Sequence, residues 1–293
     1  MRFRPRASAV GGLEDAVLFR LGYYNQLTSS FTLRNPRNLS HLLAEPRNVY
    51  FHDLFEYVRY FGACDFNYVF GDVTDVPEEP ALVKSRPIGP GNERSVLFKL
   101  EKMRHFHFVR DRWSFREKFP KLAWRGRLHL NVKKETRLSL LQGFCSSPLC
   151  DVGHVNRGEQ YSQFRRDPMS ITEQLRYKYL LSLEGVDVAT NLKWIMSSNS
   201  LCFSQRPRFE TWFMEGSLIP GFHYVEIADD FRDLEDRIIY YESHPDEAME
   251  IIKNANAYVE QFRDPVKEDL LCMLVLERYL RLCSNNEGFY KDG

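Results

Sequence analysis

Several short motifs that identify common enzyme classes are missing from this chain of 293 residues. It contains no GxGxxG, GxxxxGK(S/T), HExxH or GxSxG segment. These motifs supply, in turn, a dinucleotide-binding turn, a phosphate-binding loop, a zinc site and an activated serine. Their absence argues against a dinucleotide dehydrogenase, a P-loop enzyme such as a kinase or sulfotransferase, a zinc protease and an α/β-hydrolase.

Long apolar runs, paired cysteines and net charge are also lacking. No apolar stretch reaches 18 residues, so no transmembrane helix is predicted. The nearest two of the six cysteines, Cys145 and Cys150, have four residues between them, which predicts neither a zinc motif nor a disulfide framework. With 40 basic and 40 acidic residues, non-specific nucleic-acid binding is not expected. Reduced cysteines and an N-terminus without a signal-peptide core predict a cytoplasmic protein.

The charge that is present is distributed unevenly. Residues 101–140 contain 12 basic and 4 acidic residues, whereas residues 225–250 contain 2 basic and 10 acidic residues. We interpret the acidic segment as a solvated face. For the basic segment a solvated face and an anion-binding site remain alternatives, because Arg104, Arg125 and Arg137 fall beside expected turns.

Hydrophobic periodicity predicts a mixed first third and an alternating second half. The expected helices are residues 13–27, 48–61, 190–197, 209–216, 230–243, 245–262 and 265–283, with a capping box at residues 170–173 that starts a further one. The expected strands are residues 66–70, 96–100, 104–109, 177–183, 200–204 and 223–227. No regular element is expected across the proline- and glycine-rich residues 77–91. The alternation predicts an α/β protein with parallel βαβ units and a Rossmann-like C-terminal half.

A phosphate-binding turn is predicted between the strand at 177–183 and the next helix. Gly185 ends the strand, and Asp187, Thr190, Asn191 and Lys193 surround the start of the helix. Backbone N–H groups there, with the charge of Lys193, suit a phosphate. Asp187 is expected more readily as an N-cap than as a ligand.

The same region resembles a known family. The segments YKYLLSLEGVDVATNLKW at 177–194, SSNSL at 197–201, WFMEG at 212–216 and PGFHYV at 220–225 resemble glycosyltransferase family 90. Trp124-Arg125-Gly126, followed by Arg137, resembles the family's aromatic-Arg-Gly motif, and DVTDVP at 72–77 resembles the segment with its catalytic aspartate. The resemblance covers about residues 65–262 and is closer to the bacterial lipopolysaccharide-synthesis enzymes than to the eukaryotic protein O-glucosyltransferases.

The resemblance implies a GT-B-like α/β architecture, with two Rossmann-like domains facing a cleft. We expect an acceptor-side domain at 1–118, a nucleotide-sugar domain at 119–262 and a C-terminal helix at 263–293 that packs back on the first domain. It implies an inverting, metal-independent hexosyl or pentosyl transfer, without a cofactor, from a UDP-sugar to a saccharide hydroxyl in lipopolysaccharide or surface-glycan synthesis. A catalytically inactive nucleotide- or glycan-binding protein of the same fold and a transferase acting on a protein hydroxyl remain alternatives.

Site residues follow from the resemblance and from the predicted turn. Asp75 is the expected general base, with Asp72 as the rival on the same loop. Asn191 stands where eukaryotic members carry arginine, so Lys193 becomes the more important cation. Glu215 is expected either to accept hydrogen bonds from the ribose or to be a solvated carboxylate. The expected donor-binding residues are Trp124, Arg125, Gly126, Arg137, Gly185, Asp187, Thr190, Asn191, Lys193 and Glu215.

The basic N-terminus suggests a partner beyond the two substrates. The first fifty residues contain seven arginines and three acidic residues. This excess suits peripheral contact with the anionic inner face of a bacterial membrane, where a lipid-linked saccharide acceptor would be found. The alternative is that the basic segment packs against the acidic segment of the C-terminal half.

Overall fold

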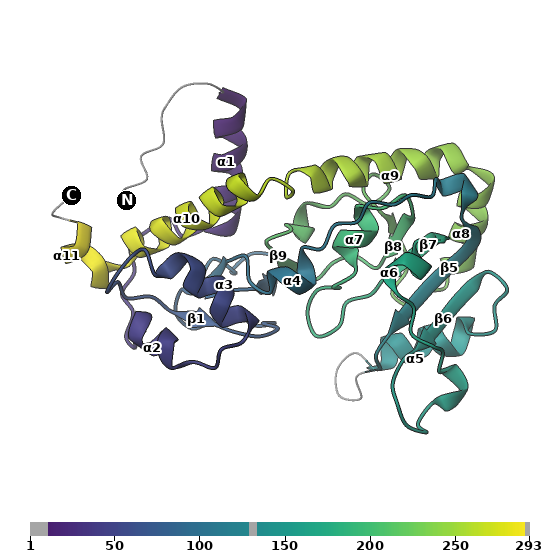
Figure 1. Ribbon diagram of the computed structural model, residues 1–293, viewed down its shortest axis with the longest axis horizontal. Coiled ribbons are helices and arrows are strands. Elements are labelled where there is room, and N and C mark those ends of the chain that lie inside the picture. The colour runs from purple at the N-terminus through teal and green to yellow at the C-terminus, as the bar shows by residue number, and fades with distance from the viewer. Residues whose placement is uncertain (1–10, 129–133, 291–293) are drawn as a thin grey trace.

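Two parallel sheets organise the protein (Figure 1), whose computed structural model describes residues 11–128 and 134–290. The first sheet has the order β1-β2-β4, and the second has the order β10-β8-β7-β5-β6. The first consists of β1 (Tyr68–Val69), β2 (Ala81–Val83) and β4 (Ser95–Leu97). The second consists of β5 (Phe119–Gly126), β6 (Cys150–His154), β7 (Tyr177–Ser182), β8 (Leu201–Ser204) and β10 (Val225–Glu226). Every pairing within them is parallel, which confirms the predicted α/β class and the βαβ units of the C-terminal half.

Helices accompany each sheet. Those of the N-terminal part are α1 (Gly11–Tyr24), α2 (Leu39–Ala44), α3 (Val49–Val58) and α4 (Lys102–His105). Those of the second sheet are α5 (Lys134–Phe144), α6 (Ile171–Gln174), α7 (Leu192–Met196), α8 (Leu234–Ser243) and α9 (Pro245–Glu260), followed by α10 (Pro265–Leu282) and α11 (Glu287–Tyr290). The predicted capping box is confirmed at α6, where Ser170 and Glu173 bond each other's backbone N–H. No helix among the described residues is long and apolar enough to cross a membrane.

The second sheet is buried on both faces. Tyr179 and Leu181 of β7 belong to one hydrophobic cluster, which includes side chains of α5 and α8. Leu180 between them points to the other cluster, which continues into the N-terminal part of the chain. Burial on both faces is typical of parallel sheets covered by helices, and it leaves the strand ends as the places where a ligand can approach.

Two connections join the N-terminal part to the second sheet. Strand β3 (Ser85–Pro87) pairs antiparallel with β9 (Phe209–Thr211), and the buried Arg86 bonds Glu210 at 2.7 Å within this ladder. Helix α10, yellow in Figure 1, then returns from the second sheet along α1 and α3. Its Glu268 forms a 2.6 Å ion pair with Arg20 of α1, which secures the return.

Three of the secondary-structure predictions were wrong. Residues 77–91 contain β2 and β3, because each strand is only three residues long and Pro80 and Pro87 lie at strand ends, where a missing N–H is tolerated. Residues 209–216 form β9 and a short 3-10 turn, because Met214 adopts a left-handed φ of 56° and β9 pairs with β3. The expected strand at 104–109 is α4 followed by irregular chain, whose Val109 N–H donates to Ser197 Oγ instead of to a neighbouring strand.

Candidate functional site

A cavity of about 590 Å³ opens at the carboxyl ends of β5 and β7, where parallel α/β sheets bind ligands. Its walls are formed by Arg104, Trp124, Arg125, Gly126, Arg127, Arg137, Ile171, Gln174, Leu183, Thr190, Asn191 and Trp194. Six of the predicted donor-binding residues thus come together. Among the described residues, the lining contains four arginines and no aspartate or glutamate, so this part of the cavity is suited to an anion.

The Trp-Arg-Gly motif has a steric explanation. The indole ring of Trp124 lies over Gly126, and a Cβ atom added to Gly126 would stand 2.4 Å from a ring carbon. Glycine is therefore required if the indole is to lie against the end of β5. In this position Trp124 is buried and forms one wall of the cavity.

Arg125 lines the cavity, but its guanidinium is already engaged in hydrogen bonds and an ion pair within the protein. Its Nη2 bonds Asp151 Oδ1 at 2.7 Å, its Nη1 donates to the Asp151 carbonyl at 2.8 Å, and its Nε donates to the Asp167 carbonyl at 3.0 Å. Burial alone would raise the pKa of Asp151, but hydrogen bonds from Tyr177 and Arg125 outweigh it and lower the pKa. Arg125 thus connects β5, β6 and the segment before α6.

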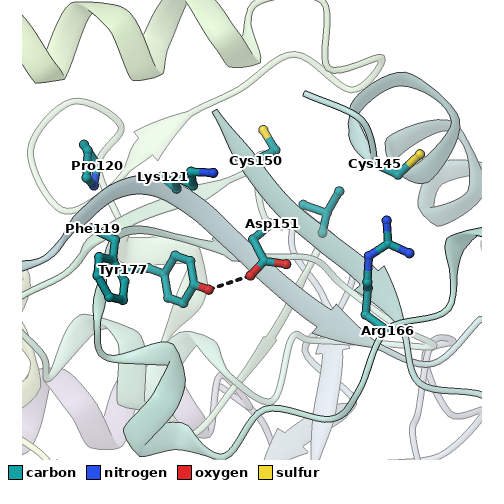
Figure 2. Close-up of a pocket in the computed structure, with 9 residues that line it drawn as sticks. Phe119, Pro120, Lys121, Cys145, Cys150, Asp151, Arg166 and Tyr177 are labelled. Carbon is teal, nitrogen blue, oxygen red and sulfur yellow. Dashed lines mark hydrogen bonds between the residues drawn. The ribbon is translucent and has the colours of Figure 1, made fainter. Parts of the chain in front are cut away.

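Asp151 also lines a second cavity, of about 390 Å³, near the amino ends of β5 and β7. Figure 2 shows the Tyr177 hydroxyl donating to Asp151 there, with Arg166 on the other side of the carboxylate. Predicted site residues do not line this second cavity. The two cavities are connected through Asp151, because Tyr177 of the second cavity orients this carboxylate and Arg125 of the first cavity bonds it.

Arg137 is a buried cation without a carboxylate partner among the described residues. It is 9% exposed, and its guanidinium donates to the backbone carbonyls of Arg127 and Glu184. Its Nε is buried and has no hydrogen-bond acceptor. Burial lowers the pKa of Arg137, which reflects the cost of an uncompensated charge. The side chain lies 5.7 Å from the centre of the Trp124 ring and faces the same cavity.

Two predicted residues of the turn after β7 support this arrangement. A Cβ atom at Gly185 would lie 3.3 Å from Nη2 of Arg137, so glycine leaves room for the guanidinium. Asn191 donates from Nδ2 to the Leu181 carbonyl at 2.9 Å, which ties the start of α7 to β7. The N-cap of α7 is Asn191, so the expectation that Asp187 caps this helix was wrong.

Three other predicted donor-binding residues do not line the cavity. Lys193 is fully buried and pairs with Glu215 at 2.5 Å, and Glu215 also accepts from the Thr211 N–H at 2.6 Å. Lys193 outweighs the effect of burial and lowers the pKa of Glu215. This placement corrects the expectation that Lys193 is the main phosphate-binding cation, because its charge is neutralised inside the protein. Asp187 is buried as well and bonds Lys84 at 2.8 Å.

The two candidate bases lie in different surroundings. The carboxylate of Asp72 forms an ion pair with the buried Nζ of Lys84. Asp75 is exposed, its Oδ2 lies 3.3 Å from Thr74 Oγ1, and no cation in the described part of the chain pairs with it. The carboxylate of Asp75 is therefore the more available of the two.

Several residues of the cavity wall were not among the expected donor-binding residues. These are Arg104, Arg127, Ile171, Gln174, Leu183 and Trp194. Arg104 and Arg127 belong to the basic segment recognised from charge, and Arg127 directly follows the Trp-Arg-Gly motif. The positive charge of the segment, and for Arg127 its place next to the Trp-Arg-Gly motif, could thus have indicated these two residues.

Comparisons with known proteins agree with the resemblance seen in the sequence. The model of the family described as Glycosyl transferase family 90 matches residues 98–283. O-glucosyltransferase LpsA of Dichelobacter nodosus is 46% identical over 273 residues, which cover 92% of this chain and 84% of that protein. Protein O-glucosyltransferase 3 of Homo sapiens is 25% identical over 172 residues, covering 57% of this chain and 33% of that protein. Protein O-glucosyltransferase 1 of Rattus norvegicus is 24% identical over 124 residues, covering 42% and 31%.

Proposed function

Because this chain belongs to glycosyl transferase family 90 and is a glycosyltransferase, we propose that it transfers a sugar from a UDP-sugar to a saccharide hydroxyl with inversion. The observation that carries the choice of donor is the cavity whose described lining has four arginines and no acidic side chain. A diphosphate would provide the anionic partner that no described carboxylate gives to Arg137. Arg127, which is exposed beside it, would share the charge of the departing group.

In the proposed reaction Asp75 is the general base. It takes the proton of the acceptor hydroxyl as that oxygen attacks the anomeric carbon, and the bond from this carbon to the diphosphate oxygen breaks. The negative charge left on the diphosphate is stabilised by Arg137 and Arg127. Asp72 suits the base role less well, because its carboxylate is already engaged in an ion pair with the buried Lys84.

A GT-B-like arrangement would place these groups around one cleft. We place the acceptor domain at 1–118 and the donor domain at 119–262, and the segment 263–293 returns to the first. The return is supported by Tyr279 of α10, whose hydroxyl donates to the Pro80 carbonyl at 2.7 Å. The loop with Asp75 meets the donor-side loop at Ser85, whose Oγ lies 2.9 Å from the Val73 carbonyl and 2.7 Å from Asp187.

For the substrates, we propose a glucosyl transfer to a saccharide of lipopolysaccharide or a related surface glycan. The support is the name of the relative that is 46% identical, O-glucosyltransferase LpsA, whereas the relatives named for protein acceptors match less of the chain. The test is a screen of UDP-sugars for donor hydrolysis and for transfer to a delipidated saccharide core. Calorimetric titration with UDP would identify an inactive binding protein, which would bind the nucleotide without turnover with any donor.

Activity is expected to persist in excess EDTA. The described residues contain no group of three or more His, Cys, Asp or Glu side chains that could hold a metal. Arginines can stabilise the diphosphate in place of a divalent ion. The measurement is UDP release with EDTA and with added Mg²⁺ after removal of bound metals. Activity that disappears with EDTA and returns only with Mg²⁺ would contradict this prediction.

We also propose a cytoplasmic location with peripheral contact to an anionic membrane. Three of the seven arginines contribute less to this contact, because Arg20 is buried against Glu268, and Arg34 and Arg37 pair with Glu79 and Glu45. The remaining predicted charges include Arg2, Arg4 and Arg6, which lie outside the described residues.

Binding to vesicles is therefore expected to be weak and sensitive to salt. Sedimentation with vesicles containing phosphatidylglycerol should pull down the protein at low ionic strength, and physiological salt should reduce the bound fraction. Replacing Arg2, Arg4 and Arg6 by glutamine should abolish the binding. The membrane proposal fails if the protein stays in solution at low ionic strength.

A further inference from the structure

Lys84 belongs to the N-terminal part of the protein and contacts three other chain segments, those with Asp72, Glu101 and Asp187. Its side chain is only 2% exposed, and it follows β2 directly. Its Nζ forms an ion pair with Asp72, lies 2.8 Å from Asp187 Oδ2 and lies 3.5 Å from Glu101 Oε2. Burial would lower the pKa of Lys84, but Asp187 and Asp72 outweigh it and raise the pKa. The ammonium group is thus held charged among three carboxylates.

The three carboxylates belong to segments that meet at the proposed active site. Asp72 is three residues before Asp75 in the loop after β1. Asp187 is three residues before Thr190, which lines the arginine-rich cavity. Glu101 bonds Arg104, another cavity residue, at 3.1 Å. Lys84 therefore contacts the loop of the proposed base, the donor-side loop and the residue that orients Arg104, although it does not itself line the cavity.

The backbone at Glu101 shows how firmly this cluster is held. Glu101 adopts the left-handed conformation, with φ 58° and ψ 44°, which is uncommon for a residue with a side chain. Its carboxylate accepts a hydrogen bond from the Tyr50 hydroxyl at 3.1 Å and lies 3.4 Å from Nε2 of the buried His105. Such a conformation persists only where surrounding contacts stabilise it.

We propose that Lys84 is a positioning residue. Through its ion pairs with Asp72 and Asp187, it fixes the position of the loop with Asp75 relative to the donor-side loop. This inference rests on the proposed function, because the loops matter only if donor and acceptor react between them. It also assigns Asp72 a role, as the carboxylate through which Lys84 holds the base loop. Without Lys84, the partly exposed carboxylate of Asp72 and the buried carboxylate of Asp187 would face each other without a cation between them, and the two loops would separate.

The test compares Lys84→Met with a matched variant, Lys118→Met. Lys118 is also a buried lysine, is paired with Asp111 at 2.6 Å and does not line the cavity. In Lys84→Met, kcat for transfer is expected to fall about 10- to 100-fold, since small misplacements of reacting groups are costly. The dissociation constant of UDP should change less than about 3-fold, because Arg137 is untouched. Lys118→Met should lower stability but leave kcat near the wild-type value.

Hydrogen–deuterium exchange supplies a measurement that does not depend on activity. Exchange in residues 71–77 and 185–191 should increase in Lys84→Met and remain unchanged in Lys118→Met. Lys84→Arg, which keeps the charge, should restore part of kcat. If Lys84→Met does not fold, Asp72→Asn and Asp187→Asn provide the same comparison, each expected to lower kcat while leaving UDP affinity within about 3-fold.

The outcomes separate this inference from the proposed function. If the wild-type protein turns over no UDP-sugar, the proposed function fails, and the exchange data still decide whether Lys84 holds the loops. If the wild-type protein is active and Lys84→Met keeps the kcat and exchange of Lys118→Met, the positioning role is overturned. A loss confined to UDP affinity, with kcat unchanged, would overturn it as well.

Discussion

Replacing Arg137 by methionine is expected to lower kcat/KM for sugar transfer by about 10² to 10³-fold, the effect of removing one donor to a developing oxyanion. UDP affinity should fall as well, because the guanidinium would contact the diphosphate in both the bound and the reacting state. The ligand-free protein should retain its stability or gain some. In that state Arg137 is buried and no carboxylate of the described residues pairs with it, so methionine removes a charge that these residues do not compensate.

Arg86→Met is the matched comparison for stability. Arg86 is also a buried arginine, but it bonds Glu210 at 2.7 Å. Its removal leaves a buried carboxylate unpaired and should cost about 3–5 kcal/mol of unfolding free energy. Urea denaturation of both variants, together with calorimetry for UDP, separates the two effects. An Arg137→Met protein that binds UDP as tightly as the wild type would exclude Arg137 from the diphosphate site.

Replacing Asp75 by asparagine is expected to lower kcat by about 10² to 10⁴-fold, the usual contribution of a general base. Asparagine has nearly the same shape but cannot accept the acceptor's proton. UDP affinity should stay within a few-fold, because the base acts on the acceptor hydroxyl and not on the diphosphate. The measurement is initial-rate kinetics of transfer at saturating donor, with UDP binding determined separately.

Two further variants of the same loop test whether the loss of kcat is specific to Asp75. Glu78→Gln removes an exposed carboxylate, 95% accessible, and should leave kcat unchanged. Asp72→Asn should lower kcat less than Asp75→Asn does, because Asp72 acts through Lys84. A larger loss in Asp72→Asn than in Asp75→Asn would reverse the two assignments and make Asp72 the base.

Elements whose apolar periodicity matches their burial could be predicted from the sequence. Helices α9 and α10 and strands β7 and β8 were predicted within a few residues, since each buries one face or all of its side chains. Strand β9 could not be predicted in this way. The spacing of Phe209, Trp212 and Phe213 resembles a helix period, but pairing with β3, more than 120 residues away, decides its conformation.

For the charged residues of the site, the sequence predicted some of those that line the cavity but not which partners they have. The motif around Arg125 and Arg137 indicated the donor side, and both residues line the cavity. The sequence could not show that Arg125 is engaged by Asp151 while Arg137 has no carboxylate partner in the described chain. Nor could it show that Lys193 pairs with Glu215, although only 22 residues separate them.

The amino-acid sequence by itself determined the α/β class, the parallel second sheet and the family, because local patterning and short motifs are sufficient for these. The tertiary structure alone decided which charged side chains are free to bind substrate. Whether a lysine, arginine or aspartate is available depends on the partners that distant segments bring to it, and burial makes those pairings strong. Lys84 illustrates this, since all three carboxylates around it, those of Asp72, Glu101 and Asp187, come from other segments of the chain.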